Sequence, residues 1–317
     1  MSRLTVKVAE LTAQGSGNLS IRLVPLPGQA LPAFAAGAHI DVFLPGDMIR
    51  QYSIASAPSQ RDHFELCVKK EPDSRGGSRF VHERLVVGEE LSISAPRNLF
   101  AIEPADRYLL IAAGIGITPL MSMATALKEQ QQPFALHYYT RTQDEAPYAD
   151  RLETQLATGQ VQLHHSDQGR SPRQHVPDDL MRPNPGTQLY LCGPEAFMRH
   201  MTERALALGW LPAQIHQEAF APIATTSVGD AFEVQVNSTG QVVAVHAEQS
   251  IAEALLAAGV EVAVSCEQGF CGACLTPVLQ GTPCHRDSVL SDGERAMNDQ
   301  MALCCSRSRS GRLVLGI

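Results

Sequence analysis

The chain has 317 residues, of which 44% are hydrophobic and 18% are charged. This length suits two or three domains, and the apolar content suffices for several buried cores, which excludes general disorder. The 33 acidic residues outnumber the 25 basic ones, and no basic run accompanies them. The composition therefore argues against nucleic-acid binding through a charged face, whereas it is compatible with docking onto a basic protein partner.

Residues 1–102 are predicted to form the first domain, an antiparallel β-barrel or sandwich. Short runs of alternating apolar and polar residues, broken by Gly, Pro and Asn, are typical of such folds. The expected strands are Leu4–Val8, Leu19–Val24, His39–Phe43, Gln51–Ile54, His63–Lys69 and Glu90–Ser94. The N-terminus shows no apolar segment of the kind found in signal peptides, so we expect no export signal and a cytoplasmic location.

Residues 103–222 alternate between strand and helix patterns, which predicts a parallel sheet with crossover helices. The expected strands are Tyr108–Ala113, Phe134–Tyr139 and Gln188–Cys192, and the expected helices are Pro119–Glu129, Tyr148–Ala157 and Glu195–Leu208. The uncharged stretch Tyr108–Leu127 has the length of a membrane span. Its glycines and proline favour a buried strand, a turn and a helix start instead, so we expect no membrane segment.

Residues 221–229 are small and uncharged and include a proline, and we interpret the stretch 223–231 as a linker. In the last domain, residues 232–317, a hairpin of Phe232–Asn237 and Val242–His246 precedes a helix, Ile251–Ala258, and a cysteine-rich loop. Six of the eight cysteines fall in this domain. In a chain without a secretion signal, such crowding indicates metal binding more often than disulfides.

The most specific motif is Cys266-x4-Cys271-x2-Cys274, followed by Cys304. It has the plant-type spacing of an iron–sulfur cluster, which requires four thiolates. The glycines within the loop let the backbone approach the sulfides and present N–H groups to them. A zinc site is the alternative, but zinc loops usually contain two close cysteine pairs, and this segment contains one.

A glycine-rich turn, Gly114-Ile115-Gly116-Ile117-Thr118-Pro119, follows a predicted strand and opens a predicted helix. Glycines at such a turn let the backbone close on a pyrophosphate at the positive end of the helix dipole. The dinucleotide fingerprint is incomplete, because Pro119 occupies the third glycine position. Cys192-Gly193-Pro194 repeats the strand–turn–helix arrangement. Both turns can converge on one crevice, where open α/β sheets bind ligands.

A third group of residues lies in the predicted barrel, namely Arg50-Gln51-Tyr52-Ser53, Val68-Lys69 and Gly76-Gly77-Ser78. Arg and Lys can hold a phosphate, Tyr offers a flat amphipathic surface, and Ser offers a hydroxyl to a heterocycle. Taken alone, these residues also fit a solvated arginine and a core tyrosine.

Together and in this order, these motifs resemble the phthalate dioxygenase reductase family, the FMN- and NADH-dependent reductases of Rieske oxygenases, with vanillate demethylase reductases as similar relatives. The resemblance covers nearly the whole chain and includes Glu218-Ala219-Phe220, the stretch from His285 to Leu290, and the stretch from Cys304 to Arg307. It implies an antiparallel flavin-binding β-barrel, a Rossmann-like parallel α/β NADH domain and a C-terminal β-grasp 2Fe-2S ferredoxin domain.

The resemblance also implies which residues bind the cofactors. For FMN these are Arg50, Gln51, Tyr52, Ser53, Val68, Lys69, Gly76, Gly77, Ser78, Thr118 and Phe220. For NADH they are Gly114, Gly116, Ile117, Thr118, Pro119, Arg141, Cys192, Gly193 and Pro194. For the 2Fe-2S cluster they are Cys266, Cys271, Cys274 and Cys304. Spacing alone does not decide between Cys304 and Cys305, and we expect an extended chain there, in which only one of them faces the cluster.

A nicotinamide delivers two electrons as hydride, a cluster accepts one at a time, and a flavin can divide the pair. The resemblance therefore implies a reductase that takes hydride from NADH onto FMN and passes single electrons through the cluster to a separate terminal oxygenase, in aromatic catabolism. No acid–base residue is required, so we interpret His137, His164, His165 and His285 as structural. The alternatives are a redox-sensing or scaffold protein, FAD in place of FMN, and NADPH if Arg141 attracts a 2′-phosphate.

Overall fold

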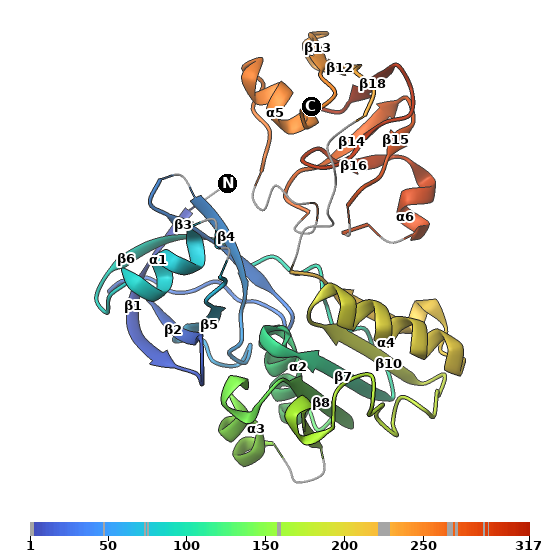
Figure 1. Ribbon diagram of the computed structural model, residues 1–317. Helices are drawn as coiled ribbons and strands as arrows, with labels where there is room; N and C mark the ends of the chain where they lie inside the picture. Colours follow the sequence, from blue (N-terminus) through green and yellow to red (C-terminus); the bar gives the residue numbers. More distant parts are fainter. Residues whose placement is uncertain are drawn as a thin grey trace. The chain divides into compact units, whose positions relative to one another are not determined.

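The computed structural model describes residues 3–46, 48–72, 74, 76–156, 160–220, 229–264, 269, 272–287, 289–290 and 292–317. The chain divides into two compact units, Ser2–Phe220 and Ala221–Ile317 (Figure 1). The predicted linker 223–231 lies mostly outside the described residues, which resume at Gly229.

The first part of the larger unit is a six-stranded, barrel-like antiparallel sheet with strand order β4-β3-β6-β1-β2-β5. Its strands are β1 (Arg3–Ala13), β2 (Asn18–Pro25), β3 (His39–Leu44), β4 (Met48–Ser53), β5 (Phe64–Lys69) and β6 (Glu90–Ser94). Alternate residues such as Ile21, Leu23 and Ile40 fill a core on one side of the sheet. This alternation is what predicted the strands. The helix α1 (Gly77–Glu83) was not predicted, because it is short and has no acidic residue in its first turn.

The second part is a five-stranded parallel sheet with strand order β11-β10-β7-β8-β9. Its strands are β7 (Arg107–Ala113), β8 (Phe134–Thr140), β9 (Val161–His165), β10 (Thr187–Cys192) and β11 (Ile215–Glu218). Its helices are α2 (Ile117–Glu129), α3 (Ala149–Gln155) and α4 (Glu195–Leu208), with short 3-10 turns η1 (Gly114–Gly116), η2 (Gln143–Glu145), η3 (Ser166–Gln168) and η4 (Pro212–Gln214). The parallel sheet is as predicted, whereas the two edge strands β9 and β11, which are rich in His and Gln, were missed.

Helices cover both faces of this parallel sheet (Figure 1). Helix α2 packs with Leu110 and Ala112 of β7, whereas α4 packs with Leu109 and Ile111, which point to the opposite face. The core under α2 also contains Cys67 and other side chains of the barrel segment. This shared core explains why the barrel and the parallel sheet form one unit.

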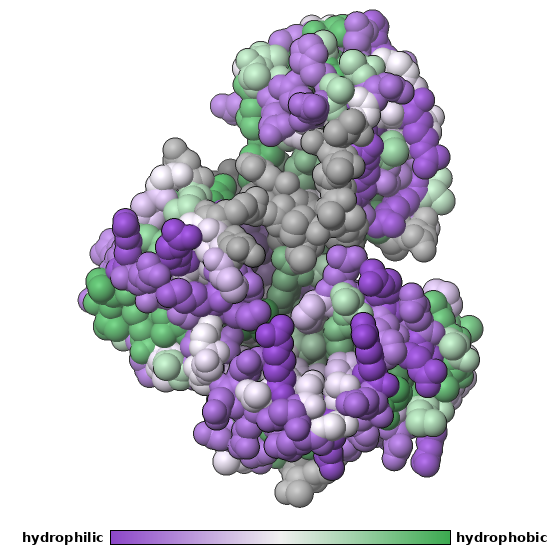
Figure 2. Space-filling view, viewed as in Figure 1, coloured by the Kyte–Doolittle hydropathy of each residue, from purple (hydrophilic) through white to green (hydrophobic). Residues whose placement is uncertain are grey.

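The uncharged stretch Tyr108–Leu127 folds as most of β7, η1 and most of α2. Among the described residues, no helix is both long and apolar enough to cross a membrane. The visible surface is mainly hydrophilic (Figure 2). Exposed large hydrophobic side chains occur in many segments of the chain, as is normal for water-facing surfaces; they are Val86, Val87, Leu99, Met181, Leu206, Leu211, Val242, Leu256, Leu279 and Met297.

The smaller unit contains a five-stranded sheet with order β13-β12-β18-β14-β16 and a two-stranded pair, β15 with β17. Its elements are β12 (Phe232–Val236), β13 (Val242–Val245), α5 (Ile251–Ala257), β14 (Leu275–Gln280), β15 (Pro283–Cys284), α6 (Asp292–Met297), β16 (Gln300–Ala302), β17 (Arg307–Ser308) and β18 (Arg312–Leu315). The predicted hairpin and helix are present. Helix α5 starts at a capping box in which Ser250 and Glu253 bond each other's backbone amides.

Candidate functional site

Two glycine turns meet at the carboxyl edge of the parallel sheet. Strands β7 and β10 are neighbours, with Ala112 beside Cys192. A Cβ atom on Gly116 would lie 2.3 Å from the Cys192 carbonyl oxygen and 2.7 Å from the Gly193 nitrogen. A Cβ atom on Gly193 would in turn lie 2.9 Å from the Cβ of Ala113. The structure therefore brings together the two turns that the sequence places apart, in backbone contact that only glycine permits.

The first of these turns leads directly into α2. Gly114 has φ of 53°, with open space where a Cβ would stand, and its carbonyl accepts a hydrogen bond from Tyr138 Oη at 3.0 Å. Residues 116–118 are buried, and Thr118 Oγ1 donates to the Ile115 carbonyl at 3.1 Å. Ile117 is the first residue of α2, so the positive end of this thirteen-residue helix lies at the turn. The arrangement can hold an anionic pyrophosphate.

Arg141 and Pro194 lie at the same edge of the sheet. Arg141 directly follows β8, is exposed, and accepts a bond from the Asp167 amide through its carbonyl at 3.1 Å. Pro194 caps α4, where its carbonyl accepts from the Phe197 amide at 2.9 Å. Cys192 is fully buried, and burial together with the nearby Glu218 carboxylate raises the pKa of its thiol, so it stays neutral.

Arg50 and the two glycines at the start of α1 come together in the barrel. The Arg50 side chain lies over Gly77, where a Cβ atom would be 2.5 Å from its Nε. Arg50 also donates from Nη1 to its neighbour's carbonyl, that of Ile49, at 2.8 Å. Gly76 has φ of 96°, which favours glycine at the start of the helix. Ser78 Oγ bonds Ser74 Oγ at 2.9 Å, so this hydroxyl already has a protein partner.

Tyr52 and Ser53 occupy the end of β4. Tyr52 packs partly against the barrel core, and burial raises the pKa of its phenol to about 12, although Arg50 opposes the rise. Ser53 is buried and donates from Oγ to Glu218 Oε2 at 3.3 Å. Burial raises the pKa of Glu218 to about 8, and the bond from Ser53 opposes this. The Nδ1 atom of His39 lies 4.0 Å from Glu218 Oε1.

Glu218 is a site residue to which the sequence alone assigned no role. It ends β11 beside Cys192 of β10 and contacts Ser53 of the barrel, so it joins the predicted flavin and coenzyme residues. The sequence placed it only within the Glu218-Ala219-Phe220 motif, because a contact between residues so far apart in the chain leaves no local pattern. That motif was the available indication.

The other residues predicted to bind the flavin contact neighbouring protein groups. Val68 is buried in the barrel core, and its carbonyl is 2.9 Å from Nε2 of His82. Lys69 is exposed and pairs with Glu71 at 3.4 Å. Gln51 donates to Asp41 Oδ1 at 3.3 Å. Phe220 packs against the shared core under α2.

Three of the histidines interpreted as structural lie in the parallel-sheet domain. His137 Nδ1 is 3.1 Å from His164 Nε2, and its other ring nitrogen is 3.1 Å from Asp179 Oδ2. His137 and Asp179 therefore form a His–Asp contact. The rings of His137 and His164 are fully buried against the sheet, and His164 stacks on Tyr139 with ring centroids 4.5 Å apart. His165 bonds Thr140 Oγ1 through Nδ1 at 2.8 Å.

His164 should make the stability of this domain sensitive to acid. Burial first, and then neighbouring His137 and His175, lower the pKa of His164 from 6.5 to about 3. The unfolded chain therefore takes up a proton below pH 6.5 that the folded chain does not. The stabilisation is complete above pH 6.5 and is lost as the pH falls toward 3, by about 2 kcal/mol at pH 5.

We expect His164→Asn to reduce this loss between pH 7 and 5, whereas His246→Asn, at an exposed position, should leave it unchanged. Denaturant unfolding followed by the fluorescence of the single tryptophan, Trp210, which is buried in the same domain, measures the effect. Equal pH dependence in the wild type and His164→Asn would show that His164 is not responsible.

Two of the four predicted cluster ligands lie in the described residues. Cys274 immediately precedes β14, and Cys304 follows β16, in which Ala302 pairs antiparallel with Leu275. The Leu303 amide also donates to the Cys274 carbonyl at 3.2 Å. Both cysteines therefore lie at the same end of one strand pair, as two ligands of one cluster require.

Cys266 and Cys271 fall outside the described residues. Within the described part of the chain, no group of three or more metal-ligating side chains is placed to hold an ion. The donor set that the structure does place, two cysteines brought together by β14 and β16, fits a thiolate-bound cluster.

The expected extended chain at Cys304 and Cys305 is wrong. The stretch 303–305 is a turn, closed by a bond from the Ser306 amide to the Ala302 carbonyl at 3.0 Å. Cys305 is buried in the core of the unit, and its Sγ lies 2.5 Å from the position of a Cβ on Gly269. Cys304 is less buried. A turn, and not the alternation of a strand, therefore places Cys305 in the core and leaves Cys304 less buried.

Comparisons with known proteins cover almost all of the chain. Family models match in succession: an oxidoreductase FAD-binding domain at residues 10–102, the N-terminal domain of dimethylamine monooxygenase subunit DmmA-like proteins at 95–215, and a 2Fe-2S iron–sulfur cluster binding domain at 234–309. The vanillate O-demethylase oxidoreductase of a Pseudomonas species is 43% identical over 319 residues, covering 100% of each chain.

Solved structures agree. Phthalate dioxygenase reductase, described as a modular structure for electron transfer from pyridine nucleotides to [2Fe-2S], matches with a TM-score of 0.74 and 32% identity, covering 100% of this chain and 98% of that one. An intact type IV self-sufficient cytochrome P450 monooxygenase matches with a TM-score of 0.89 and 36% identity, covering 99% of this chain and 41% of that chain.

The fold and these matches define a flavin-binding oxidoreductase with a 2Fe-2S domain, that is, an electron-transfer reductase. The chain belongs to the family of the vanillate O-demethylase oxidoreductases, and it has the fold of phthalate dioxygenase reductase. The predicted family, fold class and oxidoreductase activity are confirmed. The individual site residues remain predictions.

Proposed function

We propose that this chain is the NADH-dependent, FMN-containing reductase component of a multi-component Rieske-type oxygenase. Hydride passes from NADH to FMN, and single electrons pass through the 2Fe-2S cluster to a separate terminal oxygenase. The observation that carries the proposal is the backbone contact between Gly116 and the Cys192-Gly193 turn, beside the Ser53–Glu218 hydrogen bond. It supports a coenzyme crevice that opens next to the barrel residues assigned to the flavin.

The coenzyme site rests on backbone geometry. Gly116 and Gly193 remove the side chains that would separate the two turns, and the start of α2 provides a positive dipole for the pyrophosphate. Arg141 lies at the same edge of the sheet, one strand away, where it can meet the adenosine end. No second positively charged residue stands beside Arg141 in the sequence to help it bind the 2′-phosphate of NADPH. We therefore propose NADH as the coenzyme.

The flavin site rests on β4 and the start of α1. Arg50, lying over Gly77, offers a guanidinium to the FMN phosphate. Tyr52, whose phenol stays neutral, would line the ring system of the bound flavin, and Ser53 is held in place by its bond to Glu218. When bound, the flavin accepts an electron pair as hydride and releases single electrons to the cluster. The protein groups orient the partners and exclude water.

FMN is favoured over FAD by the segment that follows Ser78. An adenine usually needs an aromatic surface to stack on. Between Ser78 and residue 102 the phenylalanines are Phe80, which packs against the barrel core, and Phe100, which is 4% exposed in the shared core. Phe80 is half-buried and Phe100 is buried, so this segment has no fully exposed aromatic ring for an adenine.

The proposal of a separate partner is supported by the relatives. The chain covers 100% of the Pseudomonas vanillate O-demethylase oxidoreductase but only 41% of the self-sufficient P450 monooxygenase. The additional length of the latter indicates that a terminal oxygenase and a reductase of this kind can be fused or separate. We propose an oxygenase of aromatic catabolism as the partner, in the cytoplasm.

Cofactor extraction and coenzyme comparison test the proposal. The purified protein should release FMN, and no FAD, on acid precipitation, and should contain iron and labile sulfide in equal amounts. Oxidation of NADH with a small acceptor should exceed that of NADPH by at least about tenfold in kcat/KM. Release of FAD, or equal use of both coenzymes, would contradict the corresponding part of the proposal.

Arg50→Ala tests the flavin phosphate site. The variant removes a charge-assisted contact worth about 1.5–3 kcal/mol, so FMN affinity should fall by about one to two decades. Arg22→Ala serves as the comparison, because Arg22 is a partly exposed arginine of the barrel that pairs with Asp62 at 2.9 Å and is not among the predicted flavin residues. FMN retained through dialysis measures the effect. Equal retention by Arg50→Ala and the wild type would return Arg50 to the role of a surface residue.

A further inference from the structure

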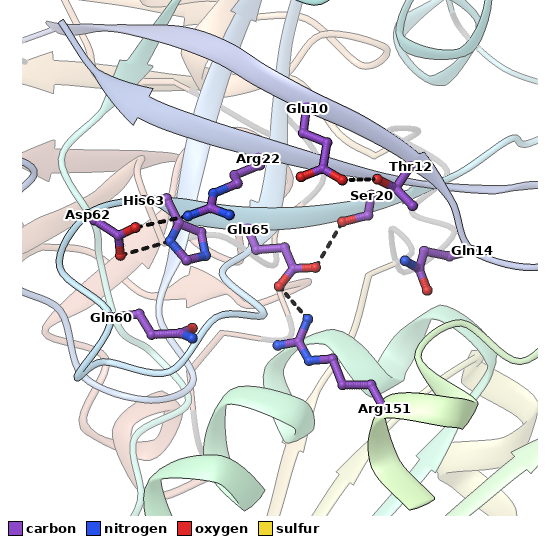
Figure 3. A pocket seen from close by; sticks show the side chains of 10 residues that line it. All are labelled: Glu10, Thr12, Gln14, Ser20, Arg22, Gln60, Asp62, His63, Glu65 and Arg151. Atoms are coloured by element: carbon purple, nitrogen blue, oxygen red, sulfur yellow. Dashed lines mark hydrogen bonds and ion pairs between the residues drawn. The ribbon is translucent and has the colours of Figure 1, made fainter. Parts of the chain in front are cut away.

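A polar hollow of about 430 Å³ lies where the barrel meets α3 (Figure 3). Its walls come from β1, β2 and the turn between them, from β5 and the segment before it, and from Arg151 of α3. The charged groups on these walls already have partners: Glu10 accepts from Thr12, Arg22 and His63 pair with Asp62, and Arg151 pairs with Glu65. The hollow is therefore bordered by satisfied ion pairs, and one of them joins the two domains of this unit.

One of the segments of the parallel-sheet domain that meet the barrel begins immediately after Arg141. It is fixed at three successive points. The Ser16 amide donates to the Asp144 carbonyl at 2.6 Å, the Tyr148 amide donates to Gln14 Oε1 at 3.2 Å, and Arg151 Nη1 donates to Glu65 Oε2 at 2.6 Å. Residues 142–151 are thus bonded to the β1–β2 hairpin and to β5.

The turn of the β1–β2 hairpin approaches residues 142–151 closely. Gly15 has φ of 67°, and a Cβ atom there would lie 2.2 Å from the Asp144 carbonyl oxygen. Tyr148 is buried and has φ of 63°, a left-handed conformation that is strained for a residue with a side chain. The Arg151 guanidinium lies 5.1 Å from the centre of the Tyr148 ring. The strained residue is thus held by the barrel on one side and by Arg151 on the other.

The ion pair between Glu65 and Arg151 is suited to hold residues 142–151 against the barrel. The side chains of Glu65 and Arg151 are only 13% and 26% exposed, so solvent screens their attraction incompletely. The second oxygen of Glu65 accepts from Ser20 Oγ at 2.9 Å, which fixes the carboxylate for Arg151. By contrast, Arg22 and Asp62, which line the same hollow, are 42% and 68% exposed and both belong to the barrel segment.

We propose that Glu65 and Arg151 are positioning residues for coenzyme binding: the barrel braces residues 142–151 and thereby fixes Arg141 for the adenosine end of NADH. This inference rests on the proposed function for the identity of the coenzyme. When the brace is lost, coenzyme binding must also order the segment, so affinity falls. Hydride transfer at saturating NADH is unaffected, because neither residue contacts the reacting atoms.

Three variants of the full-length, flavin-loaded protein test the brace. Arg151→Ala removes the guanidinium, and Glu65→Gln removes the charge but retains an oxygen for Ser20. Arg22→Ala is the matched control, because it breaks an arginine–carboxylate pair at the same hollow within the barrel segment. Steady-state turnover with ferricyanide gives KM for NADH and kcat. Hydrogen exchange of residues 142–151 gives a readout that does not depend on turnover.

We expect KM for NADH to rise about fivefold to tenfold in Arg151→Ala and Glu65→Gln, with kcat within about twofold of the wild type. The double variant should show no further rise, because both changes remove one contact. Exchange at the Tyr148 amide should be faster in both variants, and Arg22→Ala should match the wild type. Unchanged exchange in Arg151→Ala, or an equal rise of KM in Arg22→Ala, would overturn the brace.

Failure of the proposed function gives a different result. If NADH does not reduce the wild-type protein at all, the coenzyme assignment is wrong. The exchange comparison then decides on the brace alone: faster exchange in Arg151→Ala and Glu65→Gln but not in Arg22→Ala supports it, and equal exchange in all four proteins contradicts it.

Discussion

Gly116→Ala is expected to bind NADH at least about tenfold more weakly than the wild type, and so to reduce its flavin more slowly at coenzyme concentrations that saturate the wild type. The new methyl group would lie 2.3 Å from the Cys192 carbonyl oxygen and 2.7 Å from the Gly193 nitrogen. Both are backbone atoms, which cannot turn aside as a flexible side chain can. The two glycine turns must therefore separate, and the crevice between them changes shape.

The expected losses of stability and of coenzyme affinity in Gly116→Ala follow from overpacking in a buried site. Forcing the turns apart should destabilise the domain by about 1–3 kcal/mol, and coenzyme affinity should fall at least tenfold, since about 1.4 kcal/mol is enough for that. Gly311→Ala is the control, because a Cβ there meets no heavy atom within 4 Å. Anaerobic rapid mixing measures the affinity, from the dependence of the rate of flavin reduction on NADH concentration. Wild-type affinity in Gly116→Ala would show that the turns do not form the coenzyme site.

Cys304→Ala should lose the iron–sulfur absorption, while Cys305→Ala retains it. Cys304 follows β16 at the end where Cys274 precedes β14, and the loss of one thiolate leaves an iron without its protein ligand. Cys305 is buried in the core, and its truncation should cost only about 1 kcal/mol of stability. Cys304→Ala should still bind flavin and oxidise NADH with ferricyanide.

Iron and sulfide content, together with the visible spectrum, distinguish the two cysteines. A Cys305→Ala variant that keeps only the yellow flavin spectrum, beside a red Cys304→Ala variant that keeps the cluster spectrum, would reverse the assignment. It would also mean that the turn at 303–305 presents Cys305 to the cluster, against its burial beside Gly269.

The sequence predicts most of this fold because its elements carry strong local patterns. Helix α4 has the predicted bounds, Glu195–Leu208, since it starts after a proline and ends before Gly209 in a left-handed conformation. The edge strands β9 and β11 were missed because they are short and carry His and Gln instead of an apolar run. The strands β14 to β17 depend on pairing with distant segments, which no local pattern reveals.

The candidate site was predictable to the extent that each part has its own motif. The two glycine turns were expected to converge, and they do, because parallel strands end at one edge. The Ser53–Glu218 bond and the Arg151–Glu65 pair join residues that are far apart in the chain. Such contacts depend on how the barrel packs against the parallel sheet. The turn at Cys304 was missed because it follows a strand of only three residues.

The order of electron transfer is the central claim, and anaerobic rapid mixing with NADH tests it most directly. The flavin and cluster absorptions are followed separately in the full-length protein. We predict that flavin absorbance falls first, at a rate that depends on NADH concentration, and that cluster reduction follows at a rate that does not. Reduction of the cluster before the flavin, or without it, would contradict the account.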